Sequence, residues 1–153
     1  MIAEDPATGA TNVNGRKERS LELADFIAAN KERICDIWTA EAKTRYSPAL
    51  DESELLDHLP AFLDEVVAAL RAGSWKKMEM AERHGRDRVA HGTDIGMLVG
   101  ELSLVGEVVA ELAGEEGRDL TAEECTLLFR AIGLGISQSA LAYAEERDEE
   151  LAD

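Results

Sequence analysis

The sequence predicts an all-α protein, a helical bundle of five to six helices in a single domain. Apolar residues recur at helical spacing along most of the chain, and no segment shows the sustained alternation that is typical of a β-strand. Only three prolines occur among 153 residues, so few positions interrupt a helix. The length suits one domain with one core.

The first helix is predicted to run from Ser20 to about Tyr46. Residues 1–19 mix proline, glycine, asparagine and threonine without periodicity, and we expect them to form a disordered tail. The Ser20 hydroxyl can cap the free N–H groups of the first turn, and Ser47-Pro48 ends the helix. The apolar side of this helix comprises Leu23, Phe26, Ile27, Ile34 and Trp38.

Two shorter helices are predicted next. Asp51 and Glu54 have the spacing of a capping box, which satisfies free backbone donors at the start of a helix. Pro60 lacks the N–H that a helix interior needs, so we expect a short helix up to His58 and a second helix directly after it. Gly73 ends the second helix.

A charged helix is predicted from Ser74 to Gly92. Its acidic and basic residues lie at i,i+4 spacing, which is typical of a face exposed to solvent. Thr93 or Asp94 then caps a helix that carries several glycines and ends in the segment GEEGRD.

The last helix is predicted from a capping box formed by Thr121 and Glu124 to about Arg147. We therefore expect a helical domain over residues 20–147, followed by a charged C-terminal extension over residues 148–153. The segment LAYAEERDEELAD turns from apolar to charged, as expected of a helix that leaves a globular body to reach an output domain. A charged, frayed end is the alternative.

The helix after Asp94 contains four glycines, although each one inside a helix costs roughly 0.5–1 kcal/mol relative to alanine. Apolar residues lie on two separate faces of this helix, with small residues between them. The last helix shows the same combination: its predicted core face includes Leu128, Phe129 and Ile132, and three of its leucines recur every seven residues elsewhere on it. We infer that the small side chains permit a close contact between helices.

A homodimer built on these last two helices accounts for the pattern, because a two-fold interface uses the same patch twice. The candidate interface residues are Met97, Gly100, Leu104, Val108, Leu127, Leu134 and Leu141. Two alternatives stay open: both helices are buried at the centre of a monomeric bundle, or the glycines leave space for a small-molecule ligand between helices.

The composition excludes some classes of partner. The formal net charge of −16 repels a phosphate backbone, so no nucleic acid is expected. No apolar run approaches the roughly 20 residues that span a bilayer, and the N-terminus has no signal-peptide core, so we expect a cytoplasmic protein without a membrane partner. Cys35 and Cys125 are expected to be buried, reduced thiols, with a disulfide or redox pair as the alternative.

We predict no catalytic residue, no metal ligand and no cofactor. The sequence lacks HExxH, CxxC, P-loop, GxSxG and ExxH patterns. His84 and His91 are the candidates for binding a cofactor, since either could be an axial ligand of haem in a globin. His84 could instead be the exposed histidine of a phosphotransfer module, although the usual Lys-Gly pattern after it is missing. A sensory or interaction module is therefore the default expectation.

The sequence also resembles a known family over residues 21–145. The positions that carry the resemblance are Trp38, His58-Leu59-Pro60, the run His84–Arg88–Gly92, Leu98-Val99, Glu101 and Leu104. They are similar to those of the RsbRD-type N-terminal domain, found in RsbR-like stressosome co-antagonists and in front of many bacterial sensor histidine kinases. One departure follows Glu101, where residues 105–106 are small and apolar instead of large or basic.

The resemblance implies a globin-like helix arrangement without haem, a homodimer, and signalling to a C-terminal output domain or kinase in the stress response. It names no signal, and a small-molecule ligand remains open. We therefore expect a non-catalytic sensory or regulatory domain, with a haem-binding or other small-molecule-binding globin-like sensor as the alternative.

Overall fold

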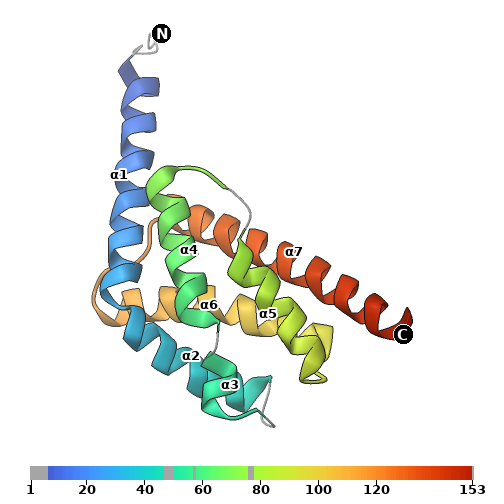
Figure 1. The fold of residues 1–153 in the computed structure, drawn as a ribbon. Helices are drawn as coiled ribbons and strands as arrows, with labels where there is room; N and C mark the ends of the chain where they lie inside the picture. The colour runs from blue at the N-terminus through green and yellow to red at the C-terminus, as the bar shows by residue number, and fades with distance from the viewer. Residues whose placement is uncertain (1–6, 47–49, 57, 76–77, 153) are drawn as a thin grey trace.

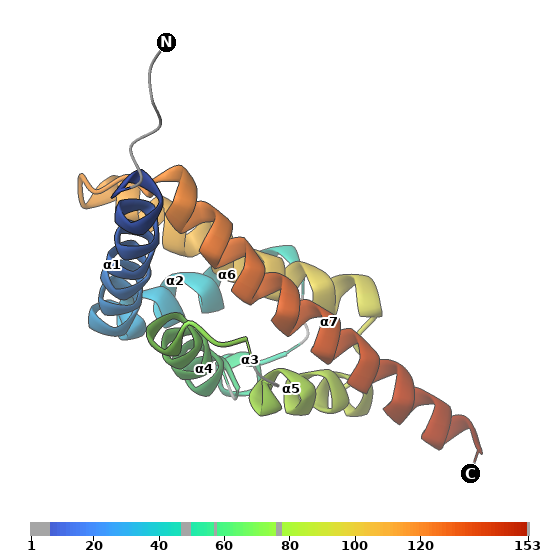
Figure 2. The same cartoon turned by 90° about the horizontal axis from the view of Figure 1, so that it is seen from above.

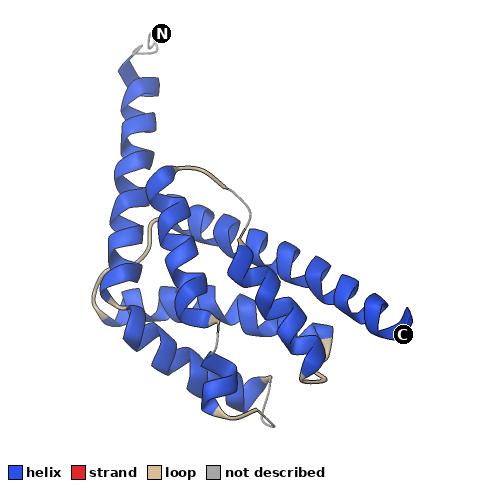
Figure 3. Cartoon of the chain, viewed as in Figure 1, coloured by secondary structure: helices blue, strands red, loops and turns tan. Residues whose placement is uncertain are grey.

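The computed structural model describes residues 7–46, 50–56, 58–75 and 78–152. Every regular element in these ranges is an α-helix, which confirms the all-α prediction (Figure 3). The helices are α1 (Ala7–Ala29), α2 (Lys31–Arg45), α3 (Glu52–Leu56), α4 (Leu59–Ala72), α5 (Glu79–Ala90), α6 (Ile95–Glu115) and α7 (Ala122–Ala152).

The N-terminal part of the chain differs from the prediction. Helix α1 begins at Ala7 and not at Ser20, so residues 7–19, expected in a disordered tail, are helical. Residues 1–6 of that expected tail lie outside the described ranges. Ser20 is not a cap, because its hydroxyl donates to the carbonyl of Leu70 at 2.5 Å. Adding residues to a helix that is already anchored requires no new nucleation, which explains a helix without apolar periodicity.

The predicted first helix is two helices, because the chain breaks at Asn30. The side-chain amide of Asn30 donates to the carbonyl of Phe26 at 2.9 Å, and the backbone at Asn30 leaves the helical region with φ −111° and ψ 16°. Asparagine competes in this way for backbone groups that a helix uses. The break lets α2 turn away from α1 (Figure 1).

The predicted helix caps of the middle segment are confirmed. The Glu54 N–H donates to Asp51 Oδ1 at 2.9 Å, and the Asp51 N–H donates to Glu54 Oε2 at 3.3 Å. Pro60 lies in the first turn of α4, and Gly73 ends that helix with φ +64°. The short α3 ends at Leu56, earlier than predicted.

The predicted caps of the last two helices are confirmed as well. Asp94 Oδ1 accepts from the Gly96 N–H at 2.6 Å, and the capping box of Thr121 and Glu124 is formed in both directions at 3.1 Å. Helix α5 starts at Glu79, later than the predicted Ser74, whereas α7 continues to Ala152, beyond the predicted end.

Helix α6 packs between α2 and α7, while α5 lies along α7 and α1 along α4 (Figure 2). The interior contains one apolar core, whose largest fully buried side chains include Trp38, Phe62, Leu63, Leu98 and Leu104. The C-terminal part of α7 extends past the other helices (Figures 1 and 2).

The glycines of the last helices permit close contacts within the chain. A Cβ at Gly100 would overlap the ring of Tyr46, and a Cβ at Gly135 would overlap the ring of Phe62. The closest approach joins two backbones: a Cβ at Gly85 would overlap the carbonyl oxygen of Ser139. This backbone contact joins α5 and α7 through a glycine of α5, whereas Gly100 and Gly135 of the last two helices make room for aromatic side chains.

Candidate functional site

Three charged or titratable side chains lie together inside the protein: His84 and Arg88 of α5, and Glu101 of α6. Arg88 and Glu101 are 0% exposed and His84 is 5% exposed. Glu101 Oε2 is 3.0 Å from His84 Nε2 and 2.9 Å from Arg88 Nε. We call these three residues the buried charge cluster.

The local sequence explains why these side chains meet. His84 and Arg88 are four residues apart, so they share one face of α5, and this face is buried. Glu101 lies between the buried Leu98 and Leu102 on α6, so its carboxylate also enters the core. The two faces meet because α5 and α6 are joined only by a short loop.

The cluster ties four helices together. Arg88 Nη1 is 3.4 Å from the carbonyl of Glu54 in α3, and the indole N–H of Trp38 in α2 donates to the backbone carbonyl of Glu101 at 2.8 Å. Burying a charge without partners is costly, and the Glu101 carboxylate has partners in Arg88 and His84.

The cluster also defines the protonation of His84. Burial lowers the pKa of His84, and the positive charge of Arg88 lowers it further, although Glu101 acts in the opposite direction. His84 is therefore neutral at pH 7, and Arg88 compensates the charge of Glu101. Since a carboxylate only accepts hydrogen bonds, the proton of His84 is on Nε2 and donates to Glu101.

A second group of polar side chains continues the cluster toward the surface. The rings of His58 and His84 meet edge to face, with centroids 6.0 Å apart. Asp87 Oδ2 is 3.9 Å from His58 Nε2 and 3.3 Å from His91 Nδ1. His91 itself is exposed at the C-terminal end of α5.

A small apolar cavity of about 10 Å³ adjoins the cluster. Its lining comprises Trp38, His58, Leu59, Phe62, Ala81, His84 and Leu102. A space of this size holds about one water molecule, whereas ligand pockets are typically hundreds of Å³ in volume. The cavity as it stands cannot hold a porphyrin, so it does not support the haem alternative.

The two histidines predicted as cofactor candidates do not share a site. His84 lies in the core, whereas His91 is exposed. Within the described residues, no group of three or more His, Cys, Asp or Glu side chains is arranged to hold a metal ion. The phosphotransfer interpretation of His84 is wrong in this fold, because it requires an exposed imidazole and His84 is enclosed beside Glu101.

The two cysteines are free thiols, as expected. Cys35 is buried, and burial raises its pKa to about 11, so the thiol stays protonated at neutral pH. Cys125 is half-buried on α7.

The candidate dimer residues occupy different environments in the single chain. Leu104 and Val108 are buried in the core of this chain, and Gly100 contacts Tyr46. Leu127 and Leu134 are half-buried against the core. Met97 and Leu141 are exposed, at 42% and 63%.

Sequence reasoning missed the most exposed aromatic side chain. Phe129 was expected on the core side of the last helix, but it is 68% exposed. Residues at steps of four from Phe129 are also exposed and form a strip that winds around α7; they are Gly133, Ser137 and Leu141.

Sequence reasoning also placed Arg88 on an exposed face, and this is wrong. The neighbouring Arg83 and Arg86 are exposed, whereas Arg88 is completely buried. The signal that could have found the cluster was an acidic residue, Glu101, in the middle of the apolar face of α6. Its presence there requires a buried basic partner.

The positions quoted for the family resemblance converge on this site. Trp38, His58, His84, Arg88 and Glu101 come from four different segments and meet around the cluster and its cavity. The family described as RsbT co-antagonist protein rsbRD N-terminal domain matches residues 32–153 of the chain. No curated protein and no solved structure matches the chain.

Proposed function

Because the chain belongs to the family of RsbT co-antagonist protein rsbRD N-terminal domains, we propose that it is a non-catalytic sensory or regulatory domain of bacterial signal transduction. It acts in the cytoplasm as a homodimer and relays a signal to a histidine kinase or a stressosome-type output partner. The family match, which includes all of α3 to α7, carries the signalling role.

The exposed face of α7 supports the homodimer. Residues 131–144 contain no charged side chain, although 31% of the whole chain is charged. Phe129 and Leu141 are large, exposed and apolar at the two ends of an exposed strip that winds around α7, and the small Gly133 and Ser137 lie between them. Two copies of α7 can therefore approach closely at the small residues while the large ones cover each other.

The length and composition of α7 also raise the question of a membrane-spanning helix. Among the described residues, α7 is the helix whose length and composition would allow it to cross a membrane. A core helix of a bundle meets the same criterion, and α7 packs against α5 and α6 with Ser139 and Tyr143 buried. These contacts favour α7 as a bundle helix whose remaining apolar face is covered by a second copy.

The proposed path of the signal runs from the buried charge cluster through α5 to α7. The cluster anchors α5 to α6, and α5 touches the backbone of α7 where Gly85 meets Ser139. The Ser139 hydroxyl donates to the carbonyl of Ala81, and the Tyr143 hydroxyl donates to the carbonyl of Thr93 at 2.7 Å. A shift of α5 relative to α6 therefore changes the direction in which α7 leaves the domain.

Light-scattering mass measurements test the homodimer. We expect the unmodified protein to have the mass of two chains, and Phe129→Glu with Leu141→Glu to have the mass of one, because both carboxylates would be buried against a second copy. The two substitutions should not unfold the single chain, since both positions are exposed in it, and a thermal unfolding transition should still be seen.

Leu21→Glu serves as the matched control. Leu21 is an exposed apolar residue of α1, away from the face of α7, so this variant should remain a dimer. A monomeric unmodified protein, or a Phe129→Glu and Leu141→Glu variant that remains a dimer, would show that α7 is not the interface.

A further inference from the structure

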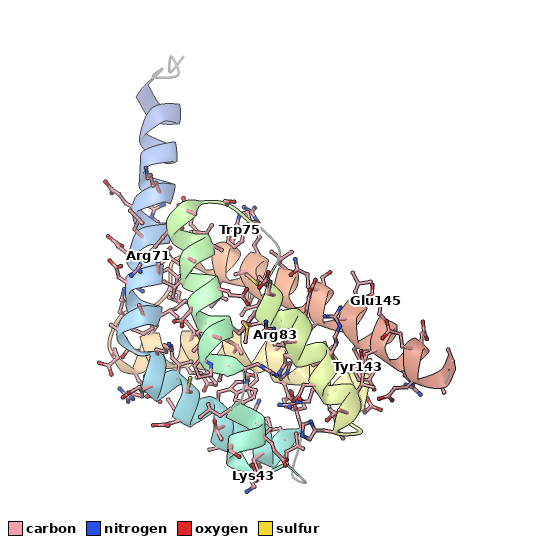
Figure 4. The ribbon with its side chains drawn as sticks, in the orientation of Figure 1. Lys43, Arg71, Trp75, Arg83, Tyr143 and Glu145 are labelled. Carbon is pink, nitrogen blue, oxygen red and sulfur yellow. The ribbon has the colours of Figure 1, made fainter. Side chains whose placement is uncertain are left out.

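A groove of about 420 Å³ lies between the middle of α1, the end of α4 and the start of α7. Trp75, directly after α4, forms part of its wall, and Arg71 lies on the last turn of α4 (Figure 4). None of the positions that carry the family resemblance lines this groove. Its volume is within the range of small-molecule pockets.

The groove is basic, although the protein as a whole is strongly acidic. Lys17, Arg71 and Arg130 line it, and no acidic side chain of the described residues does. Arg71 pairs with Asp25 at 3.2 Å, whereas Lys17 and Arg130 form no ion pair within the described part of the chain. Two uncompensated cations therefore face one groove in a chain of net charge −16.

The same groove has an apolar, aromatic wall. Trp75 and Leu127 are half-buried beside it, and the buried Leu70 also lines it. The guanidinium of Arg130 lies over the indole ring of Trp75, 5.7 Å from the ring centroid. A guanidinium held in this way keeps N–H groups available at its edge for an anion.

A neighbouring hollow of about 260 Å³ along the first turns of α7 shares Leu127 and Arg130 with the groove. Its one acidic residue, Glu123, pairs with Arg19. The two hollows together give room for a ligand with an extended body next to the cationic groups.

We propose that this groove binds a small organic anion with a flat apolar body. The anionic group lies between Lys17 and Arg130, and the apolar body covers Leu127 and the exposed part of Trp75. Charge-assisted hydrogen bonds and stacking supply the affinity. The net charge of −16 repels a large polyanion at longer range, which favours a small ligand over a nucleic acid or a polyanionic surface.

Two dyes with the same aromatic body provide the test. The probe 1-anilinonaphthalene-8-sulfonate carries a sulfonate, and N-phenyl-1-naphthylamine lacks it. We expect Lys17→Gln with Arg130→Gln to weaken saturable binding of the sulfonate dye about tenfold or more, because hydrogen bonds to charged groups are lost. Binding of the neutral dye should change much less.

Lys31→Gln with Arg33→Gln is the matched control. It removes the same amount of positive charge at exposed positions whose partners are Asp64, Glu115 and Glu116, far from the groove in the fold. This control should bind both dyes as the unmodified protein does. Circular dichroism should be unchanged for both double variants, since all four positions are exposed or half-exposed.

A displacement experiment on the unmodified protein complements the measurements on the variants. Naphthalene-2-sulfonate should displace the sulfonate dye, whereas 2-naphthylmethanol should not do so at equal concentration. Equal weakening of the sulfonate dye in both double variants, or equal displacement by both naphthalene compounds, would overturn the proposal. Dye binding at the α7 face would appear as binding that Phe129→Glu removes and Lys17→Gln with Arg130→Gln leaves intact, and this also would overturn it.

Discussion

Arg88 neutralises the carboxylate of Glu101 at a place where neither side chain reaches solvent. Water normally stabilises an ionised carboxylate, and here Arg88 and His84 replace it, while backbone carbonyls of α3 accept from the guanidinium of Arg88. A buried charge pair of this kind adds little net stability compared with an apolar pair of equal size. Removing only one of the two residues, however, leaves an uncompensated charge in the core, which is strongly destabilising.

Removal of Arg88 alone should therefore be severe. We expect Arg88→Leu to lower the free energy of unfolding by about 3–5 kcal/mol, because the Glu101 carboxylate would stay buried without its cationic partner. Urea unfolding monitored by circular dichroism measures this change.

The double variant Arg88→Leu with Glu101→Leu is the informative comparison. It replaces both charges by apolar side chains and should recover a large part of the lost stability. If the double variant is less stable than Arg88→Leu alone, the two residues do not act as a compensated pair.

His84 should make the stability of the protein depend on pH. Its pKa in the folded protein is below the ordinary value of 6.5, so the unfolded chain binds the proton more readily. Stability is then fully present above about pH 6.5 and falls as the pH decreases through 6.5 toward the folded pKa, by at most about 1.4 kcal/mol per pH unit.

Denaturant midpoints between pH 7.5 and 5.5 test this dependence. The decrease should be smaller in His84→Gln, which has no imidazole to protonate, and should persist in His91→Gln, whose side chain is exposed. A slope that is unchanged by His84→Gln would assign the pH dependence to other groups.

At the scale of elements, the contact between α5 and α7 leaves no room for a side chain at Gly85. We expect Gly85→Ala to destabilise the protein by about 1–3 kcal/mol, because the added methyl group meets the Ser139 backbone and not a flexible side chain. Thermal unfolding measures the effect. The higher helix propensity of alanine offsets only a fraction of it.

Gly106→Ala provides the comparison within the same fold. Gly106 is also buried in a helix, but a Cβ there would lie 3.7 Å from Ile132 Cγ1, an ordinary contact distance. This variant should keep or slightly raise the stability. If Gly85→Ala and Gly106→Ala lower the stability equally, the α5 and α7 backbones are not as close at Gly85 as the structure places them.

The sequence predicted several helix ends correctly where a local interaction defines them, although the predicted cap at Ser20 is wrong. The capping boxes at Asp51 and Thr121, the cap at Asp94 and the position of Pro60 depend on residues within one turn, and all are confirmed. The break at Asn30 was missed, because apolar residues continue at helical spacing on both sides of it.

The candidate site was harder to predict from the sequence, because it depends on contacts between helices that are distant in the chain. Sequence patterns alone placed His84 among exposed charges and left the role of Glu101 undefined. Only the fold brings Arg88, Glu101 and Trp38 from three helices to one point. Likewise, the heptad of Leu127, Leu134 and Leu141 mixes exposed and half-buried positions, which the packing of α7 against α5 and α6 decides.

At the scale of the whole molecule, α7 belongs to two surfaces of different character. Its first turns border the basic groove with Arg130, and its middle presents the uncharged face from Gly133 to Leu141. Its acidic end lies beyond the bundle (Figure 1). A ligand in the groove, a second copy on the uncharged face and an output partner at the end would all contact the same helix.

The backbone contact of Ser139 with Gly85 gives this helix a geometry that amplifies small movements. About 20 Å of helix separate Ser139 from Ala152, at a rise of 1.5 Å per residue. If α7 pivots at Ser139, a tilt of about 10° displaces its last turn by about 3 Å. A rearrangement in the core that tilts α7 by this angle thus becomes a displacement at Ala152 as large as a hydrogen-bond length.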